Sequence, residues 1–146
     1  VEAVRPWLTK EHVHLALDPE FNMPDGKLPG RVIGTMSAAE INEAAGILNE
    51  IVGQYNLPRK ALVVYQFTPD MLTDKAAIQL QPNVDVAVVM DGFGSPELKT
   101  RHYEWYVADE SVQYGGIKLF YRQDEPLMSP EEILALEPKP NIIIYQ

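Results

Sequence analysis

Five short apolar segments, separated by stretches with the marks of helices, constrain the fold of this chain more than any other feature. The middle of each segment is a nearly continuous apolar run, such as residues 61–65 and 86–90. Strands covered on both faces, as in parallel sheets, have this composition, whereas half-exposed strands alternate polar and apolar residues. We therefore predict five parallel strands, at residues 13–18, 61–67, 84–91, 117–121 and 141–145.

The gaps between these segments carry helix-start patterns. In three of them a hydroxyl residue that can cap free amides is followed by proline, which suits the first helical position, and by an acid that complements the helix dipole. These triplets are Thr68-Pro69-Asp70, Ser95-Pro96-Glu97 and Ser129-Pro130-Glu131. Ser37 and Glu40 form a capping box ahead of a longer apolar stripe. Strand and helix therefore alternate along the chain.

This alternation predicts an α/β fold in one domain spanning residues 1–146. Right-handed crossovers between parallel strands leave two architectures, an open doubly wound sheet and a (β/α)8 barrel of the TIM type. The first strand is followed by Asp18-Pro19-Glu20 and a long connection to Gly34, and neither GxGxxG nor GxxxxGK[ST] occurs. Because an open sheet of this size usually carries a phosphate-binding loop there, the barrel is favoured.

Composition limits the partners and cofactors. A net charge of −9 disfavours nucleic acid, whose phosphates need clustered Lys and Arg. The absence of cysteine excludes disulfides, thiolate metal sites and a cysteine nucleophile. No apolar run approaches the ~20 residues that span a bilayer. We predict no cofactor and no metal site, since the acidic group around Asp25 lacks the spacing of an EF-hand and the three histidines lack a metal-binding motif.

Six segments of the chain carry a family resemblance: residues 15–21, 33–42, 65–67, 90–94, 118–121 and 140–146. They resemble a family of secreted or lipid-anchored bacterial barrel proteins that are described as glycoside-hydrolase-like at most. The resemblance implies a location outside the cell or at its surface. Members of that family are longer at the N-terminus. This implies that the five strands are the fourth to eighth of a barrel, and that the domain is the C-terminal portion of a larger one.

The ends of the predicted strands supply a candidate site, because a β/α barrel carries its function there. Glycoside hydrolysis requires one carboxyl group as proton donor and another as nucleophile or base. We assign Glu20 as the general acid, since its apolar neighbours would raise its pKa. Asp91 is then the nucleophile or base, with Asp18 as a third acid. Candidates for carbohydrate binding are Gln66, Phe93, Tyr121 and Gln146, with Trp105 as an alternative stacking residue.

Each acid also has a structural explanation, because aspartate before proline or glycine is a common turn residue and Glu20 could simply be exposed. Three functions therefore stay open: a carbohydrate-active hydrolase at the cell surface, a non-catalytic carbohydrate- or wall-binding barrel, and a structural fragment. The fragment would cover its sheet edges by forming a homo-oligomer or by pairing with a missing N-terminal half. Two carboxyl groups facing one pocket would favour the hydrolase.

Overall fold

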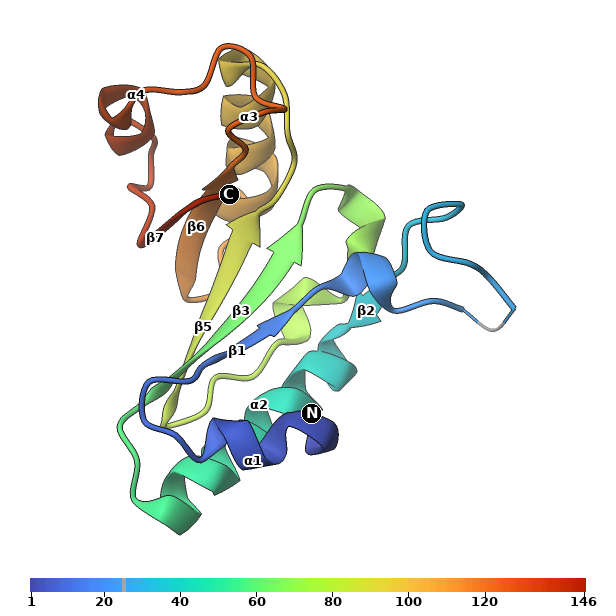
Figure 1. Ribbon diagram of the computed structural model, residues 1–146, viewed down its shortest axis with the longest axis vertical. Helices are drawn as coiled ribbons and strands as arrows, with labels where there is room; N and C mark the ends of the chain where they lie inside the picture. Colours follow the sequence, from blue (N-terminus) through green and yellow to red (C-terminus); the bar gives the residue numbers. More distant parts are fainter. Residues whose placement is uncertain (25) are drawn as a thin grey trace.

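The main sheet has five parallel strands in the order β1-β3-β5-β6-β7 (Figure 1). The computed structural model describes residues 1–24 and 26–146, so Asp25 lies outside the described residues. The strands are β1 (Leu15–Leu17), β3 (Lys60–Gln66), β5 (Val84–Met90), β6 (Tyr114–Leu119) and β7 (Ile142–Tyr145). All five predicted strands are present, with ends shifted by at most three residues. Their order in space follows their order in the chain, as in a barrel.

A second, two-stranded parallel sheet pairs β2 (Met36–Ser37) with β4 (Leu72–Thr73). The α-helices are α1 (Arg5–Leu8), α2 (Ala38–Tyr55), α3 (Pro96–Tyr103) and α4 (Pro130–Leu134). A π-helical turn, η5 (Glu104–Ala108), continues α3. Short 3₁₀ turns complete the list: η1 (Glu2–Val4), η2 (Pro19–Phe21), η3 (Pro69–Met71) and η4 (Lys75–Ala77).

Three of the four predicted helix starts are confirmed. The side chains of Ser37, Ser95 and Ser129 each accept a hydrogen bond from a backbone amide in the first helical turn, and Ser37 and Ser129 form complete capping boxes. The prediction at Thr68 is wrong. Its side chain caps nothing, and the chain makes a 3₁₀ turn and then the short strand β4. Pairing of β4 with β2 replaces a helix there, so local capping residues were overridden by strand pairing.

All four α-helices add buried side chains to one face of the main sheet. Leu62, Val64 and Val86 are buried against the apolar stripe of α2. Further along the strands, Met90 and Ile117 pack in a second core with α3, η5 and α4. A doubly wound sheet would carry helices on both faces. The described elements instead form an α/β fold with a curled, half-barrel parallel sheet, which confirms the predicted parallel β/α architecture in its coarser form (Figure 1).

Strand β6 begins three residues earlier than predicted, and the added residues include Gly115 and Gly116. A Cβ on Gly115 would lie 2.3 Å from a methyl group of Val107, and one on Gly116 would lie 2.8 Å from a methyl group of Val89. The two positions face opposite sides of the sheet, so η5 and β5 both approach β6 closely. Glycine is usually unfavourable in strands, so the sequence pattern did not indicate this packing role.

None of the helices within residues 1–24 and 26–146 is both long enough and apolar enough to cross a membrane.

Candidate active site

A pocket of about 500 Å³ lies at the carboxyl ends of the main-sheet strands. Its lining includes Asp18, Glu20, Asp91 and Lys118. The three predicted catalytic acids, which come from the ends of β1 and β5, therefore face one cavity. Parallel strands place their carboxyl ends at the same edge of the sheet, which is why residues far apart in the sequence meet here.

Strand register places Asp91 beside Lys118. Met90 pairs with Ile117, so the residues that follow them, Asp91 and Lys118, also lie side by side. Met90 and Ile117 are buried under the helices, and alternation turns Asp91 and Lys118 to the concave face. The ammonium nitrogen of Lys118 lies 3.0 Å from Oδ1 of Asp91. This ion pair is the central contact of the site.

Two aromatic rings flank Lys118. Its Nζ lies 4.6 Å from the centre of the Tyr65 ring and 5.1 Å from that of Phe120. Contacts of this kind are attractive, because the ring faces carry partial negative charge. Lys118 was not among the predicted site residues. Its position within the apolar stretch Ile117-Lys118-Leu119 was the available signal, since a strand interior rarely holds a lysine without a partner.

Glu20 is held over the pocket by a turn anchored to the start of α2. Gly34 donates its backbone N–H to the carbonyl of Glu20 over 2.9 Å. The Asn22 side-chain amide donates to the Thr35 carbonyl (2.7 Å) and to Glu40 (3.0 Å). A Cβ on Gly34 would lie 2.4 Å from the Pro19 carbonyl oxygen, so only glycine permits this close approach. Glu40, which forms the capping box of α2 with Ser37, therefore also helps to position Glu20.

Burial raises the pKa of each of the three acids. For Glu20, the negative charges of Asp18 and Asp91 raise the pKa further, while the charge of Lys118 lowers it. For Asp91, Lys118 opposes the effect of burial and Asp18 adds to it. For Asp18, burial is opposed by Lys118 and by the backbone amide of Glu20. Three carboxyl groups thus share one cation, which opposes the effect of burial on the pKa of each.

Phenyl rings form the apolar part of the pocket. Phe21 and Phe93 are 59% and 63% exposed, so their faces are open to a ligand at the mouth. Phe93 makes an edge-to-face contact with Phe120 at 6.2 Å between ring centres. His102 also lines the pocket, and burial together with nearby cations lowers its pKa. Trp105, the alternative stacking residue, lies beside His102 in η5 but does not line the pocket.

A buried ion pair behind the pocket joins the two loops that carry its wall. Lys99 of α3 lies 2.9 Å from Asp124, and both side chains are essentially inaccessible. Lys99 also donates to the carbonyls of Gly92 (2.7 Å) and Lys118 (2.8 Å). The Asp124 carboxylate accepts the backbone amides of Gly94 and Phe120, each over 2.8 Å. Together these contacts tie the loop after β5 and α3 to the end of β6 and the loop that follows it.

The predicted binding residues divide into two groups. Phe93 and Gln146 line the pocket. Gln66 faces the helix-covered side, where its side chain accepts from Lys75 over 3.0 Å and donates to the Thr68 carbonyl. Tyr121 is exposed and stacks on Tyr145 with ring centres 5.5 Å apart. Strand alternation explains the position of Gln66. It pairs with Met90, the residue before Asp91, so its side chain points to the opposite face of the sheet from Asp91.

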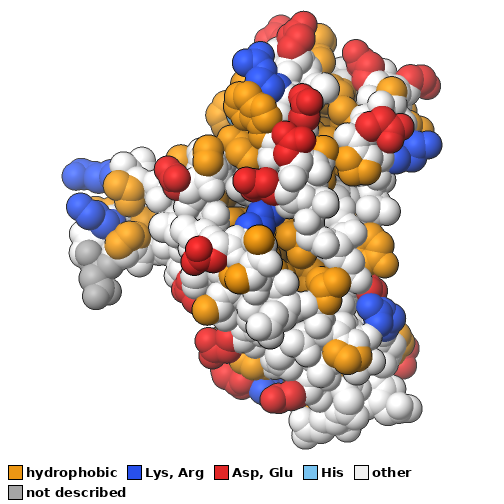
Figure 2. Space-filling view, turned by 180° about the vertical axis from the view of Figure 1, so that it is seen from behind, with side chains coloured by type: hydrophobic (Ala, Val, Ile, Leu, Met, Phe, Trp, Pro, Cys, Tyr) orange, Lys and Arg blue, Asp and Glu red, His pale blue; other side chains and the backbone are white. Residues whose placement is uncertain are grey.

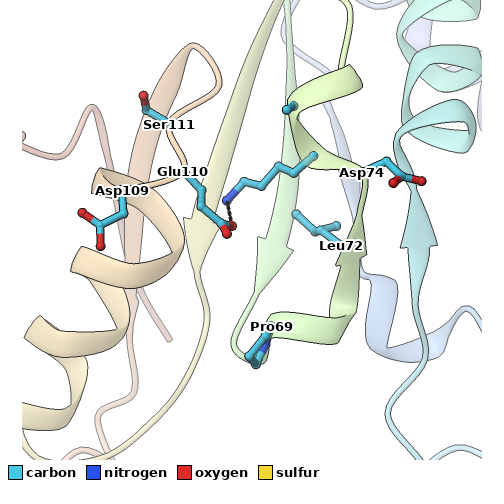
Figure 3. A pocket seen from close by; sticks show the side chains of 8 residues that line it. Pro69, Leu72, Asp74, Asp109, Glu110 and Ser111 are labelled. Carbon is cyan, nitrogen blue, oxygen red and sulfur yellow. Dashed lines mark ion pairs between the residues drawn. The ribbon is translucent and has the colours of Figure 1, made fainter.

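A second pocket, of about 520 Å³, lies beside the β3–β5 connection, which has no α-helix (Figure 3). Pro69, Leu72 and Asp74 line one side, and Asp109 and Glu110 the other (Figure 3). Its buried lysine, Lys75, already binds Gln66, the carbonyl of Tyr106 and, at 3.5 Å, Glu110. With those donors occupied, Lys75 bridges the crossover to η5. The pocket at the strand ends therefore holds the stronger candidate site.

Among the described residues, no group of three or more His, Asp or Glu side chains is arranged to hold a metal ion. No family model matches the chain, and comparisons with curated proteins and with solved structures likewise return no match. The resemblance noted in the sequence therefore stays a prediction, and the function has to be argued from the site.

Proposed function

We propose that the protein hydrolyses glycosidic bonds, with Glu20 as proton donor and Asp91 as nucleophile or base. The observation that carries this proposal is the convergence of three carboxyl groups, from two strand ends, on one pocket with aromatic walls. Paired carboxyl groups are the chemical requirement of the reaction, and exposed phenyl rings suit the apolar face of a sugar. A pocket with aromatic rings and no acid pair would instead have favoured binding alone.

The environments of the acids suggest how the roles divide. Asp91 is in contact with Lys118, which stabilises its ionised form. Glu20 has no such contact, and burial and two neighbouring acids favour its protonated form. A protonated carboxyl group beside an ionised one is the pairing that glycoside hydrolysis uses. The negative charge of Asp18 raises the pKa of both Glu20 and Asp91.

The rest of the proposal concerns the fold, the binding residues and the location. We propose that the curled sheet is part of a (β/α)8 barrel of the TIM type, with its five strands as the fourth to eighth. Phe93 and Gln146 would bind carbohydrate at the mouth, and the protein would act outside a bacterial cell or at its surface. The one-sided helix layer and the sequential strand order support the barrel.

The test is release of reducing ends from a panel of polysaccharides and oligosaccharides. We expect activity in the wild-type protein and a loss of at least about a hundredfold in Glu20→Gln and Asp91→Asn, as for other groups that transfer protons. Glu50→Gln, an exposed acid near the end of α2, is the matched control and should retain full activity.

Unchanged activity in both pocket variants would overturn the assignment. Binding of carbohydrate without turnover by the wild-type protein would assign the site to the non-catalytic alternative.

A further inference from the structure

The pocket carries more negative than positive charge. Among the described residues that line it are three carboxyl groups, while Lys118, already paired with Asp91, is the only lysine or arginine of that set. His102 adds little positive charge at neutral pH, because its pKa is lowered. The wider surface has the same sign: Asp and Glu side chains are spread over much of the face in Figure 2, and Lys and Arg occupy fewer, separate places. An anionic ligand would be repelled, and a cationic one attracted.

A buried acceptor atom in the pocket lacks a hydrogen-bond donor. Oδ1 of Asp18 has no hydrogen-bond partner within the described residues. Asp91 beside it is only 7% exposed, and its Oδ1 is held by the Lys118 ammonium group at 3.0 Å. Buried polar atoms are almost always paired in folded proteins. Asp18 lines the cavity, so a ligand that enters it can supply the missing donor.

The walls of the pocket define the shape of that ligand. Phe67 and Phe120 line the interior, while Phe21 and Phe93 stand open at the mouth. Such rings bind flat apolar faces and also attract cations, whereas a bare inorganic ion would gain little from them. The ligand therefore combines a ring with an apolar face and a positively charged donor group.

We infer that the pocket selects an amino sugar, with the ammonium group of the sugar donating to the unpartnered oxygen of Asp18. This inference rests on the proposed hydrolysis and names its substrate class: a polysaccharide of glucosamine type with free amino groups. The neutral hydroxyl of an ordinary hexose could donate one hydrogen bond there but would leave the excess negative charge unbalanced. An ammonium group has three donors and balances one carboxylate.

The experiment uses three oligosaccharides of equal length with the same β-1,4-linked backbone, which differ only at carbon 2: a free amine, an N-acetylated amine or a hydroxyl. Binding of each to the wild-type chain is measured by calorimetry at mildly acidic pH, where the amine is charged, and cleavage is followed in parallel. We expect the amine form to bind roughly ten- to a hundredfold more tightly than the hydroxyl form. In Asp18→Asn this preference should fall at least about tenfold, whereas Glu50→Gln should keep it.

The outcomes separate this inference from the proposed function. Cleavage of the hydroxyl or acetylated form with no preference for the amine would overturn the inference and leave the hydrolase standing. A preference for the amine that depends on Asp18, without cleavage of any form, would support the inference and overturn the hydrolase. An oligolysine of equal charge serves as the control for unspecific attraction. If it binds as tightly as the amino sugar, the inference is wrong.

Discussion

At the scale of single residues, Lys118 decides the chemistry of the pocket. It is the counter-ion of Asp91 and lowers the pKa of Asp18 and Glu20 as well. Its ammonium group is held between Tyr65 and Phe120, so it cannot swing away without losing both ring contacts. One cation therefore opposes the effect of burial on the pKa of three acids.

Replacing Lys118 by methionine tests this. With the counter-ion gone, the pKa of Asp91 should rise further, because burial and the charge of Asp18 are then opposed mainly by the weaker effect of Lys99. We expect the acidic limb of the kcat/KM profile, where Asp91 must lose its proton, to move to higher pH. An unchanged profile in Lys118→Met would show that Asp91 does not take the ionised role.

The same acids make folding depend on pH. The pKa of Asp18 is higher in the folded than in the unfolded chain, so the folded state binds more protons between the two values. Stability therefore falls as pH rises through this window, and the full cost is present at neutral pH. Asp18→Asn should raise the free energy of unfolding at pH 7 by about 1 kcal/mol, the order expected for relieving a poorly solvated charge.

The measurement is urea denaturation of wild type and Asp18→Asn at neutral pH and again below the ordinary pKa of aspartate. At the lower pH the carboxyl group is protonated in both states, so the difference should largely vanish. A stabilisation of equal size at both pH values would contradict the electrostatic explanation.

At the scale of elements, the ion pair of Lys99 and Asp124 couples α3 to the loops after β5 and β6. Both side chains are buried, and their hydrogen bonds to backbone groups hold the two loops together behind the pocket. A buried pair of this kind adds little net stability over apolar residues, but loss of one partner strands a buried charge.

Asp124→Ala should therefore lower the free energy of unfolding by about 3–5 kcal/mol. The matched control is the double variant Lys99→Met with Asp124→Leu, which removes both charges and should lie much closer to wild type. Chemical denaturation of the three proteins checks this. If the double variant is as unstable as the single one, the lost hydrogen bonds to backbone groups, and not the unpaired charge, explain the loss.

At the scale of the whole molecule, β1 and β7 are the two edge strands of the main sheet as far as the described residues go. Strand β7 reads Ile-Ile-Ile-Tyr, and its residues are half-buried to exposed. An apolar edge strand without a neighbour is a template for pairing with another chain. In the hypothesis of a homo-oligomer or a separate N-terminal half, a strand of the partner would pair with β7. This hypothesis is independent of the chemistry at the strand ends.

We expect the chain to associate with increasing concentration through β7. Ile143→Lys places a charge on this exposed edge position and should weaken the association at least about tenfold, because a lysine disfavours edge pairing. Leu80→Lys, an exposed apolar residue outside the main sheet, is the control. Sedimentation equilibrium measures the effect, and a monomer at every concentration would contradict the expectation.

Much of the fold follows from local sequence. Continuous apolar runs specified five strands, and the capping residues Ser37, Ser95 and Ser129 specified where helices begin, because both signals lie within a few neighbouring residues. The site acids could be predicted once parallel strands were assumed, since Asp18 and Asp91 directly follow strands. Thr68 shows the limit: the same local pattern gave a 3₁₀ turn, because β4 found a partner in β2 far away in the chain.

Sequence alone therefore determined the strand–helix alternation and the acidic strand ends of this protein, because periodicity and capping are encoded over short distances. Only the tertiary structure decided that Lys118 is the partner of Asp91 and that Gln66 turns away from the pocket. Both facts depend on the register between strands, and a shift of one residue would exchange the faces. Register is set by packing across the whole sheet, which no short segment of the chain contains.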